Sequence, residues 1–474
     1  MTLPAKFVER VLRDLGGTEG AALCAALDAE PPVSVRLNPA KTGAETVSAG
    51  PDAGLPVPEA AGLPALAIAG RVPWSRDGRY LAVRPYFTLD PDFHAGAYDV
   101  QEASSQFVGH LLAAVRTEGA RILDLCAAPG GKTTLYASLA GPGGLVVANE
   151  IDRRRASVLA DNVRKWGTGN VAVTTCEPRA LGDFEAWFDV VAVDAPCSGE
   201  GMFRKDPDAR GEWSEGNVKQ CAARQDEILR EAWRALRPGG TLVYSTCTFN
   251  RDEDEGALER MAAWAGDEIA ESEETAVEDA WGIVCGRVGA FRTFRFYPHR
   301  TCGEGFFAAV ARKSFDAGGR VRTPKARRTV FAAVDRKTAG ELARWVRNPG
   351  GMHFAAVADT CYAWYAAQAD AVRTLSEALP VIYSGVALGQ VFKGVLKPDP
   401  ALAFFDGLNR GALPAAELDD EETLRFLRRQ DIAAGGLAEG MNLVCSRGRA
   451  LGFAKRIGAR VNNLYPNSLR IIKQ

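Results

Sequence analysis

The 474-residue chain is poor in the residues that build metal sites, disulfide scaffolds and membrane spans. It has only four histidines, and its ten cysteines never stand in the CxxC spacing of a zinc site. Its apolar runs stay well short of the roughly 18 residues that cross a bilayer, and charges interrupt its N-terminal segment, unlike a signal peptide. We therefore expect a cytoplasmic protein without a metal, a membrane anchor or an obligate protein partner.

Two common nucleotide-binding motifs are missing as well. The sequence has no GxGxxG, which excludes the usual dinucleotide fingerprint. The segment 126–133, CAAPGGKT, has cysteine at the position where a P-loop needs its first glycine, so a phosphate cradle is not expected. The loop could still bind a nucleoside cofactor that it holds without phosphate contacts.

The net charge of −2 conceals an uneven distribution of charge. Seven bases lie between Arg312 and Arg328, against Asp316 alone. Residues 440–474 contain no acid and seven bases, namely Arg447, Arg449, Lys455, Arg456, Arg460, Arg470 and Lys473. Such segregation can create a local field for a polyanion, although an ordinary solvated face has the same pattern.

The alternation of short apolar runs with amphipathic helices predicts a doubly wound parallel sheet, an α/β fold, over residues 96–313. Its strands are expected to end at Leu125, Asn149, Thr175, Asp194 and Thr246. Residues 1–95 are predicted to form a small α+β domain with a loop over about 43–70. Residues 314–379 are interpreted as a linker and a helical segment, and residues 380–474 as a β-rich domain.

The residues that follow the first two strands fit a nucleoside cofactor. Ligands of such sheets bind at the carboxyl ends of the strands, and the glycines of the 126–132 loop let backbone amides approach a ligand at a helix N-terminus. Glu150, after the second strand, can hold ribose hydroxyls. This is the arrangement that binds S-adenosylmethionine. In the alternative interpretation, Glu150 is only an acid at the start of a helix.

Two cysteines are expected at the same edge of the sheet. Cys197 follows the strand that ends at Asp194, and Cys247 follows the strand that ends at Thr246. Methylation of carbon 5 of a pyrimidine needs a thiolate that adds to carbon 6 and an acid near the ring nitrogen. Lys132 can lower the pKa of a nearby thiol. Either cysteine alone would more often be an inert buried side chain.

The motifs LDLCAAPGGKT, ANEID, DAPCSGEGMFRKDP and LRPGGTLVYSTCTFN resemble those of the RNA cytosine-carbon-5 methyltransferases of the NOL/NOP/Sun family. GEGMFRKDP and the tail LGFAKRIGARVNNLYP are similar to the RsmF-type bacterial enzymes of small-subunit ribosomal RNA. The resemblance implies a Rossmann-like methyltransferase core and a C-terminal PUA-like RNA-binding module. It also implies 16S ribosomal RNA, or the small ribosomal subunit, as the partner.

The same resemblance implies roles for individual residues. Cys247 would be the nucleophile and Cys197 would assist product release, with Asp194 and Lys132 beside them. Where the family has an aspartate after the third strand, this chain has Glu177 as a substitute. The cofactor site would consist of Cys126, Ala127, Ala128, Pro129, Gly130, Gly131, Lys132, Glu150, Glu177 and Asp194.

Three other functions are compatible with parts of this pattern. The first is a transfer-RNA cytosine methyltransferase, and the second is a DNA methyltransferase, whose nucleophile would be Cys197. The third is a ribosome assembly factor that binds RNA without turnover. The Thr-Cys motif and the basic tail favour RNA, and the joint presence of both cysteines with Asp194 and Lys132 favours an active enzyme.

Overall fold

The computed structural model describes residues 2–42 and 63–472. Most of the loop expected over 43–70, and Lys473 of the basic C-terminal stretch, therefore lie outside the described residues. Within these two ranges, no helix is both long and apolar enough to cross a membrane. The same ranges hold no cluster of three or more His, Cys, Asp or Glu side chains arranged for a metal ion.

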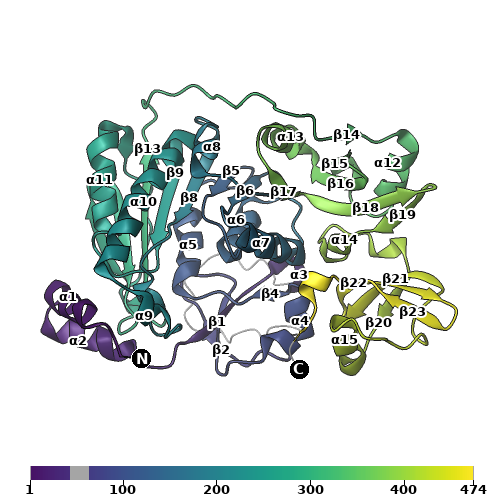
Figure 1. Ribbon diagram of the computed structural model, residues 1–474, viewed down its shortest axis with the longest axis horizontal. Helices are drawn as coiled ribbons and strands as arrows, with labels where there is room; N and C mark the ends of the chain where they lie inside the picture. Colours follow the sequence, from purple (N-terminus) through teal and green to yellow (C-terminus); the bar gives the residue numbers. More distant parts are fainter. Residues whose placement is uncertain (1, 43–62, 473–474) are drawn as a thin grey trace.

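A ten-stranded sheet forms the centre of the molecule (Figure 1). Its parallel part runs β9-β8-β5-β6-β7, with strands β5 (Arg121–Asp124), β6 (Leu145–Asn149), β7 (Val171–Thr174), β8 (Phe188–Asp194) and β9 (Leu236–Thr246). These are the five runs that the sequence places in a parallel sheet, so the predicted doubly wound fold is confirmed. The direction of winding reverses between β5 and β8, and the crevice at such a point is where these folds bind ligands.

Helices cover both faces of this sheet, which explains why its strands are almost continuously apolar. On one face Leu229 and Trp233 pack against Phe188. On the other face Leu135 and Leu159 pack against Val146. The helices of this region are α5 (Phe107–Ala113), α6 (Gly131–Ala140), α7 (Arg153–Trp166), α8 (Pro178–Gly182), α9 (Ala209–Glu212), α10 (Glu215–Ala235) and α11 (Glu255–Ala265).

Antiparallel strands extend the sheet at both edges. Beside β9 lie β13 (Phe306–Lys313), β12 (Phe291–Phe296), β11 (Val284–Val288) and the short β10 (Ile269–Ala270). Beside β7 lies β17 (Val381–Ser384), which comes from the segment assigned by sequence to the C-terminal domain. A four-residue strand does not reveal its partner, so the apolar pattern could not place β17 in the central sheet.

The N-terminal part is α+β, as predicted. A helical hairpin of α1 (Ala5–Leu15) and α2 (Gly17–Ala26) precedes a four-stranded sheet of order β2-β3-β1-β4. The remaining elements are β1 (Val33–Leu37), α3 (Pro39–Thr42), β2 (Ile68–Arg71), β3 (Gly78–Leu81), α4 (Pro91–His94) and β4 (Tyr98–Asp99). The hairpin packs its Phe7 on Phe203 and Phe249 of the core.

Strands from residues 332–365 and 386–398 form a five-stranded sheet, so the expectation of a linker and a helical segment up to residue 379 was wrong. The elements are β14 (Ala332–Ala333), α12 (Arg336–Ala343), β15 (Met352–Val357), β16 (Thr360–Tyr365), α13 (Ala369–Ala378), β18 (Val386–Phe392) and β19 (Val395–Pro398). Alanine favours helix in this stretch, but β16 pairs with the distant β18. Tertiary pairing here overrides local propensity.

The C-terminal part is β-rich, as predicted, with a sheet of order β20-β21-β22-β23. Its elements are α14 (Pro400–Phe404), β20 (Ala415–Glu417), α15 (Asp420–Leu427), β21 (Gly440–Ser446), β22 (Arg449–Ile457) and β23 (Arg460–Asn463). This sheet docks on the N-terminal part, where Asp92 of α4 pairs with both Arg447 (3.1 Å) and Arg449 (2.8 Å).

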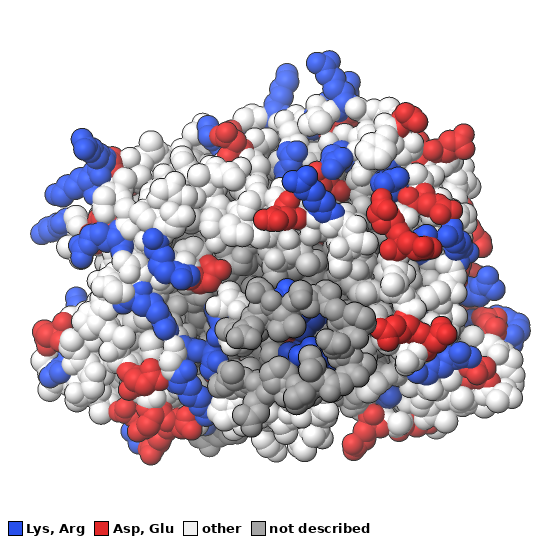
Figure 2. Space-filling model, turned by 180° about the vertical axis from the view of Figure 1, so that it is seen from behind, with Lys and Arg blue, Asp and Glu red and all other residues white. Residues whose placement is uncertain are grey.

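The two basic stretches are therefore less free than their sequences suggest. Arg447 and Arg449 meet acids from elsewhere in the chain, which corrects the expectation of a tail without nearby acids. In the other stretch, Arg312 pairs with Glu273 at 3.2 Å. Figure 2 shows Lys and Arg in scattered groups, many of them near Asp or Glu, on one face of the molecule. The excess of basic residues in these two stretches therefore does not by itself identify a binding surface for a polyanion.

Candidate active site

Three loops meet at the carboxyl ends of β5, β8 and β9. They are the 126–132 loop after β5, residues 195–201 after β8 and residues 247–250 after β9. Asp194 and Ser245 are register partners in the parallel β8–β9 pair, so the two cysteine-bearing loops leave the sheet side by side. The backbone N–H of Gly201 donates to the carbonyl of Cys247 at 2.9 Å and joins these loops.

The two predicted cysteines lie in contact at these strand ends. The Sγ atoms of Cys197 and Cys247 are 3.3 Å apart and both residues are partly buried, so one thiol can donate to the other sulfur. This hydrogen bond, together with burial, raises the pKa of Cys197 well above the usual value of a thiol. Cys197 therefore keeps its proton while it faces Cys247.

Lys132 and Asp194 form an ion pair beside the thiols. The Nζ–Oδ2 distance is 2.9 Å, and the hydroxyl of Ser245 donates to the other carboxylate oxygen of Asp194 at 2.8 Å. Burial alone would lower the pKa of Lys132, but Asp194 outweighs it, and the negative charge of a Cys247 thiolate would raise that pKa further. The net shift is upward, so Lys132 stays positively charged next to Cys247.

Side chains of α7 hold the 126–132 loop in place. On α7, Arg155 donates to the carbonyl of Ala128 at 3.0 Å, and Asn162 donates to the carbonyl of Pro129 at 2.9 Å. Gly130 has φ +114°, and a Cβ there would lie 3.0 Å from Leu159 Cδ1. The loop thus needs glycine at this turn, which brings its backbone close to α7.

Arg36 of β1 is a loop-supporting residue that sequence reasoning missed. Its Nη2 donates to the carbonyl of Gly131 at 3.1 Å and to Thr134 Oγ1 at 2.5 Å. Its guanidinium also stacks on the ring of Trp166 at 4.4 Å. An arginine between Val35 and Leu37 was the available signal, but the loop that it contacts lies about a hundred residues along the chain.

Asp124, the last residue of β5, is a second residue that the sequence analysis did not single out. It is fully buried and accepts a hydrogen bond from Thr133 Oγ1 at 2.6 Å. Burial raises the pKa of Asp124 to about 7, although the Thr133 hydrogen bond opposes this shift. An acid at the end of an apolar strand could have drawn attention to it.

Glu150 lies at the end of β6, buried and next to the cofactor loop. Its Oε1 accepts from the backbone N–H of Asp152 at 3.0 Å, and its Oε2 is 3.2 Å from Arg155 Nη1. The helix-end contact is therefore present. Arg155, however, also holds Ala128, so one arginine connects Glu150 to the loop.

Glu177 lies at the carboxyl end of β7 but does not join this cluster. Its side chain is exposed and makes no capping hydrogen bond to α8. Cys176, the residue before it, is tied to β6 instead, because its N–H donates to Asn149 Oδ1 at 3.1 Å.

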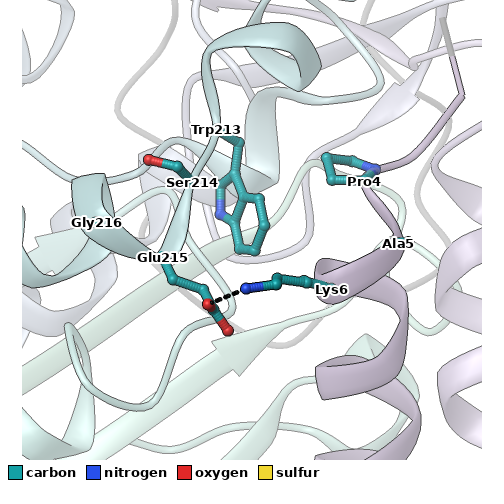
Figure 3. Close-up of a pocket in the computed structure, with 7 residues that line it drawn as sticks. All are labelled: Pro4, Ala5, Lys6, Trp213, Ser214, Glu215 and Gly216. Carbon is teal, nitrogen blue, oxygen red and sulfur yellow. Dashed lines mark hydrogen bonds and ion pairs between the residues drawn. The ribbon is translucent and has the colours of Figure 1, made fainter.

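A separate cleft of about 390 Å³ lies between α1 and the start of α10 (Figure 3). It is lined by Pro4, Ala5, Lys6, Trp213, Ser214, Glu215 and Gly216, and Lys6 pairs with Glu215 across it at 2.7 Å. The cleft includes no residue of the thiol pair or of the cofactor loop.

The doubly wound sheet, the glycine-bearing loop after its first strand and the acid after its second define an S-adenosylmethionine-dependent methyltransferase. The chain belongs to the RsmB/F family of 16S rRNA methyltransferases, whose family model matches residues 111–312. Models described as the N-terminal domain of 16S rRNA methyltransferase RsmF and the methyltransferase RsmF PUA domain match residues 3–103 and 414–471.

Similar proteins support this assignment over most of the chain. The chain is 31% identical to Ribosomal RNA small subunit methyltransferase F of Shewanella loihica, over 84% of this chain and 83% of that protein. It is 32% identical to the protein of the same name from Klebsiella pneumoniae, over 84% of each. A solved methyltransferase homolog from Pyrococcus horikoshii shares the fold, with TM-score 0.50 and 24% identity over 66% of this chain and 100% of that one.

Proposed function

We propose that this protein transfers a methyl group from S-adenosylmethionine to carbon 5 of cytosine in 16S ribosomal RNA. The observation that carries the proposal is the contact between Cys197 and Cys247 beside the Lys132–Asp194 ion pair. In this proposal residues 96–313 carry the chemistry, and residues 380–474 supply an RNA-binding module. Acting on ribosomal RNA implies work in the cytoplasm.

The first chemical step is assigned to Cys247. A cytosine flipped into the crevice exposes carbon 6 to the sulfur. Addition of the thiolate pushes electron density into the ring and makes carbon 5 nucleophilic. The ring then carries negative charge near Asp194, and the Lys132 ammonium held at 2.9 Å from that carboxylate stabilises this charge.

Cys197 is assigned to the last step. After methyl transfer, water accepts the proton on carbon 5, the electron pair of that C–H bond forms the carbon 5–carbon 6 double bond, and the carbon 6–sulfur bond breaks. Cys247 then leaves as a thiolate, and the protonated Cys197, 3.3 Å away, can donate to that sulfur as negative charge returns to it. The raised pKa of Cys197 supports this division of labour, because a donor must keep its proton.

The cofactor site fits the residues present. The glycine at position 130 lets the loop pack closely on α7, where a Cβ would crowd Leu159, and Arg36 and Asn162 hydrogen-bond to its backbone. Loop residues 126–132 and Glu150 would hold the nucleoside, with Asp194 near its reacting end. When bound, S-adenosylmethionine supplies the electrophilic methyl group. The exposed Glu177 remains a proposed contact at the rim of this site.

For RNA contact we favour the hairpin β22–β23. Lys455 is the register partner of Asn462, and Ile457 is the register partner of Arg460, so these four side chains share one face. Lys455, Ile457 and Arg460 are exposed, and the two cations have no ion-pair partner among residues 2–42 and 63–472. The basic stretch after β13 is less suited. β13 ends beside Thr241, so this stretch leaves the sheet at the end of the strands opposite to the end that carries the cysteines.

The two cysteines can be tested separately, because they act at different times. Cys247→Ala leaves no nucleophile, so we expect neither methyl transfer nor a covalent protein–RNA species. Cys197→Ala still permits attack and methyl transfer but slows elimination, so the protein stays attached to its product. A denaturing gel of each variant, after incubation with substrate RNA and cofactor, measures the covalent band.

Each alternative function predicts another gel. A DNA-type mechanism gives the mirror image, with a band from Cys247→Ala and none from Cys197→Ala. An assembly factor without turnover gives no band and no methyl transfer from any variant, the unaltered protein included. Adding Cys247→Ala to Cys197→Ala should abolish the band, which controls for trapping that does not involve the nucleophile.

A further inference from the structure

Glu253, six residues beyond Cys247 in the sequence, is a fully buried acid that the proposed chemistry does not use. Its Oε2 accepts from the backbone N–H of Ser198 at 2.8 Å, and Ser198 directly follows Cys197. The same oxygen accepts from the side-chain amide of Gln225 on α10 at 3.1 Å. A buried carboxylate therefore holds the backbone on one side of Cys197.

Gln225 holds the backbone on the other side. Its Nε2 also donates to the carbonyl of Pro196, which directly precedes Cys197, at 3.0 Å. Gln225 is itself fully buried. Together, one carboxylate and one amide clamp both neighbours of Cys197, and neither of the two is hydrogen-bonded to Cys197 or to Cys247 itself.

The position of this clamp is fixed from β9. Tyr244 donates its hydroxyl to the carbonyl of Glu253 at 2.6 Å, and the hydroxyls of Ser198 and Thr248 lie 3.0 Å apart. Cys247 directly follows the same strand. The clamp therefore fixes the position of Cys197 relative to the strand that precedes Cys247.

Only one of the two carboxylate oxygens of Glu253 takes part in the clamp. Glu253 Oε1 is buried and finds no hydrogen-bond partner within the described parts of the chain. Burying an unpaired carboxylate oxygen costs stability, whereas a neutral side chain of similar shape would avoid that cost. Burial raises the pKa of Glu253 to about 7, against the opposing hydrogen bonds from Ser198.

We propose that Glu253 and Gln225 are positioning residues that keep the Cys197 thiol against the Cys247 sulfur, and that they thereby control release of the methylated RNA. This inference rests on the proposed function. Because the clamp grips Pro196 and Ser198, its loss should displace Cys197 more than Cys247. The attack step should survive, and elimination should slow.

The test measures the first turnover and the release step separately. We expect Glu253→Ala, incubated with substrate RNA and S-adenosylmethionine, to transfer methyl groups in the first turnover and to accumulate the covalent protein–RNA band. Multiple-turnover methylation should fall about ten- to a hundredfold, the change expected when a hydrogen bond to a charged acceptor is lost. Gln225→Ala should give the same band. Glu253→Gln keeps an acceptor oxygen for Ser198 and should recover release relative to Glu253→Ala.

Two matched controls use exposed residues that make no contact with the cysteine loops. Glu259→Ala on α11 and Gln220→Ala on α10 remove the same side-chain types from the surface and should accumulate no band. Because Glu253 acts through Cys197, adding Glu253→Ala to Cys197→Ala should not increase the band further.

The outcomes separate the inference from the function on which it rests. If Cys197→Ala gives no band, the proposed mechanism fails. If Cys197→Ala gives the band but Glu253→Ala and Gln225→Ala do not, only the clamp fails. Equal slowing of the first turnover and of release in Glu253→Ala would also overturn it, as would Glu253→Gln behaving like Glu253→Ala. Should Glu253→Ala not fold, the band from Gln225→Ala decides.

Discussion

Glu150 contacts the start of a helix and also lies where it could bind the cofactor. One of its oxygens accepts from the start of α7, and the other faces the exposed Arg155. An ion pair with an exposed arginine is weak and easily exchanged for a ligand. The helix-end contact therefore does not prevent Glu150 from binding ribose hydroxyls.

Replacing Glu150 by alanine should weaken cofactor binding. Charge-assisted hydrogen bonds to two hydroxyls are worth about 1.5 to 3 kcal/mol, so the dissociation constant of S-adenosylmethionine should rise roughly ten- to a hundredfold. Titration calorimetry on the folded variant measures this directly. Arg154→Ala, which changes an exposed residue in the first turn of α7, serves as the control. Cofactor binding unaltered in Glu150→Ala would reduce Glu150 to a helix-end acid.

Residue types alone were enough to find some site members. The two cysteines and Asp194 could be predicted because each follows an apolar strand, and the carboxyl ends of parallel strands meet at one edge. Arg36, Gln225 and Glu253 could not be predicted in the same way. Each acts on a loop that is far from it in the sequence, so its role exists only once the chain is folded.

At the scale of elements, the strands buried on both faces were the easiest to predict. Runs such as LVVAN and DVVAVD are apolar except at their ends, and a parallel sheet covered by helices buries both faces of such strands. The edge strands were harder to place. β17 pairs with β7, more than two hundred residues earlier in the chain, and nothing in VIYS specifies that partner.

The β22–β23 hairpin carries a prediction about RNA binding. Replacing Lys455 and Arg460 together by alanine should weaken RNA binding and reduce the slope of log affinity against log salt by about 2, since each cation contributes one phosphate contact. Cofactor affinity should stay unchanged. Binding measured at several salt concentrations gives the slope. If the double variant has the same salt slope and the same RNA affinity as the unaltered protein, the hairpin is not part of the RNA interface.

Arg447→Ala is the informative comparison for that experiment. Arg447 meets Asp92 and Asp420 within the protein, so its loss should not change the salt slope as the hairpin variant does. Cutting the chain after Pro380 would be a poorer test. It would also remove β17 from the central sheet, and a loss of binding could then come from damage to the core.

At the scale of the whole molecule, the N-terminal and C-terminal parts are joined by buried polar contacts. His94 of α4 lies 3.2 Å from the hydroxyl of Tyr465, and Asp92 binds two arginines of the C-terminal sheet. Burial lowers the pKa of His94 to about 4, so the ring is neutral at this contact. These contacts attach the sheet that carries the hairpin β22–β23 to the N-terminal part.

The central claim is that carbon 5 of cytosine is the methylated atom. Small-subunit ribosomal RNA labelled with tritium at carbon 5 of cytosine tests this claim most directly, with methyl-labelled S-adenosylmethionine in the same reaction. The account predicts one tritium released to water for each methyl group incorporated, and loss of both in Cys247→Ala. Methyl groups that enter the RNA without release of tritium would contradict it, because another atom would then be the acceptor.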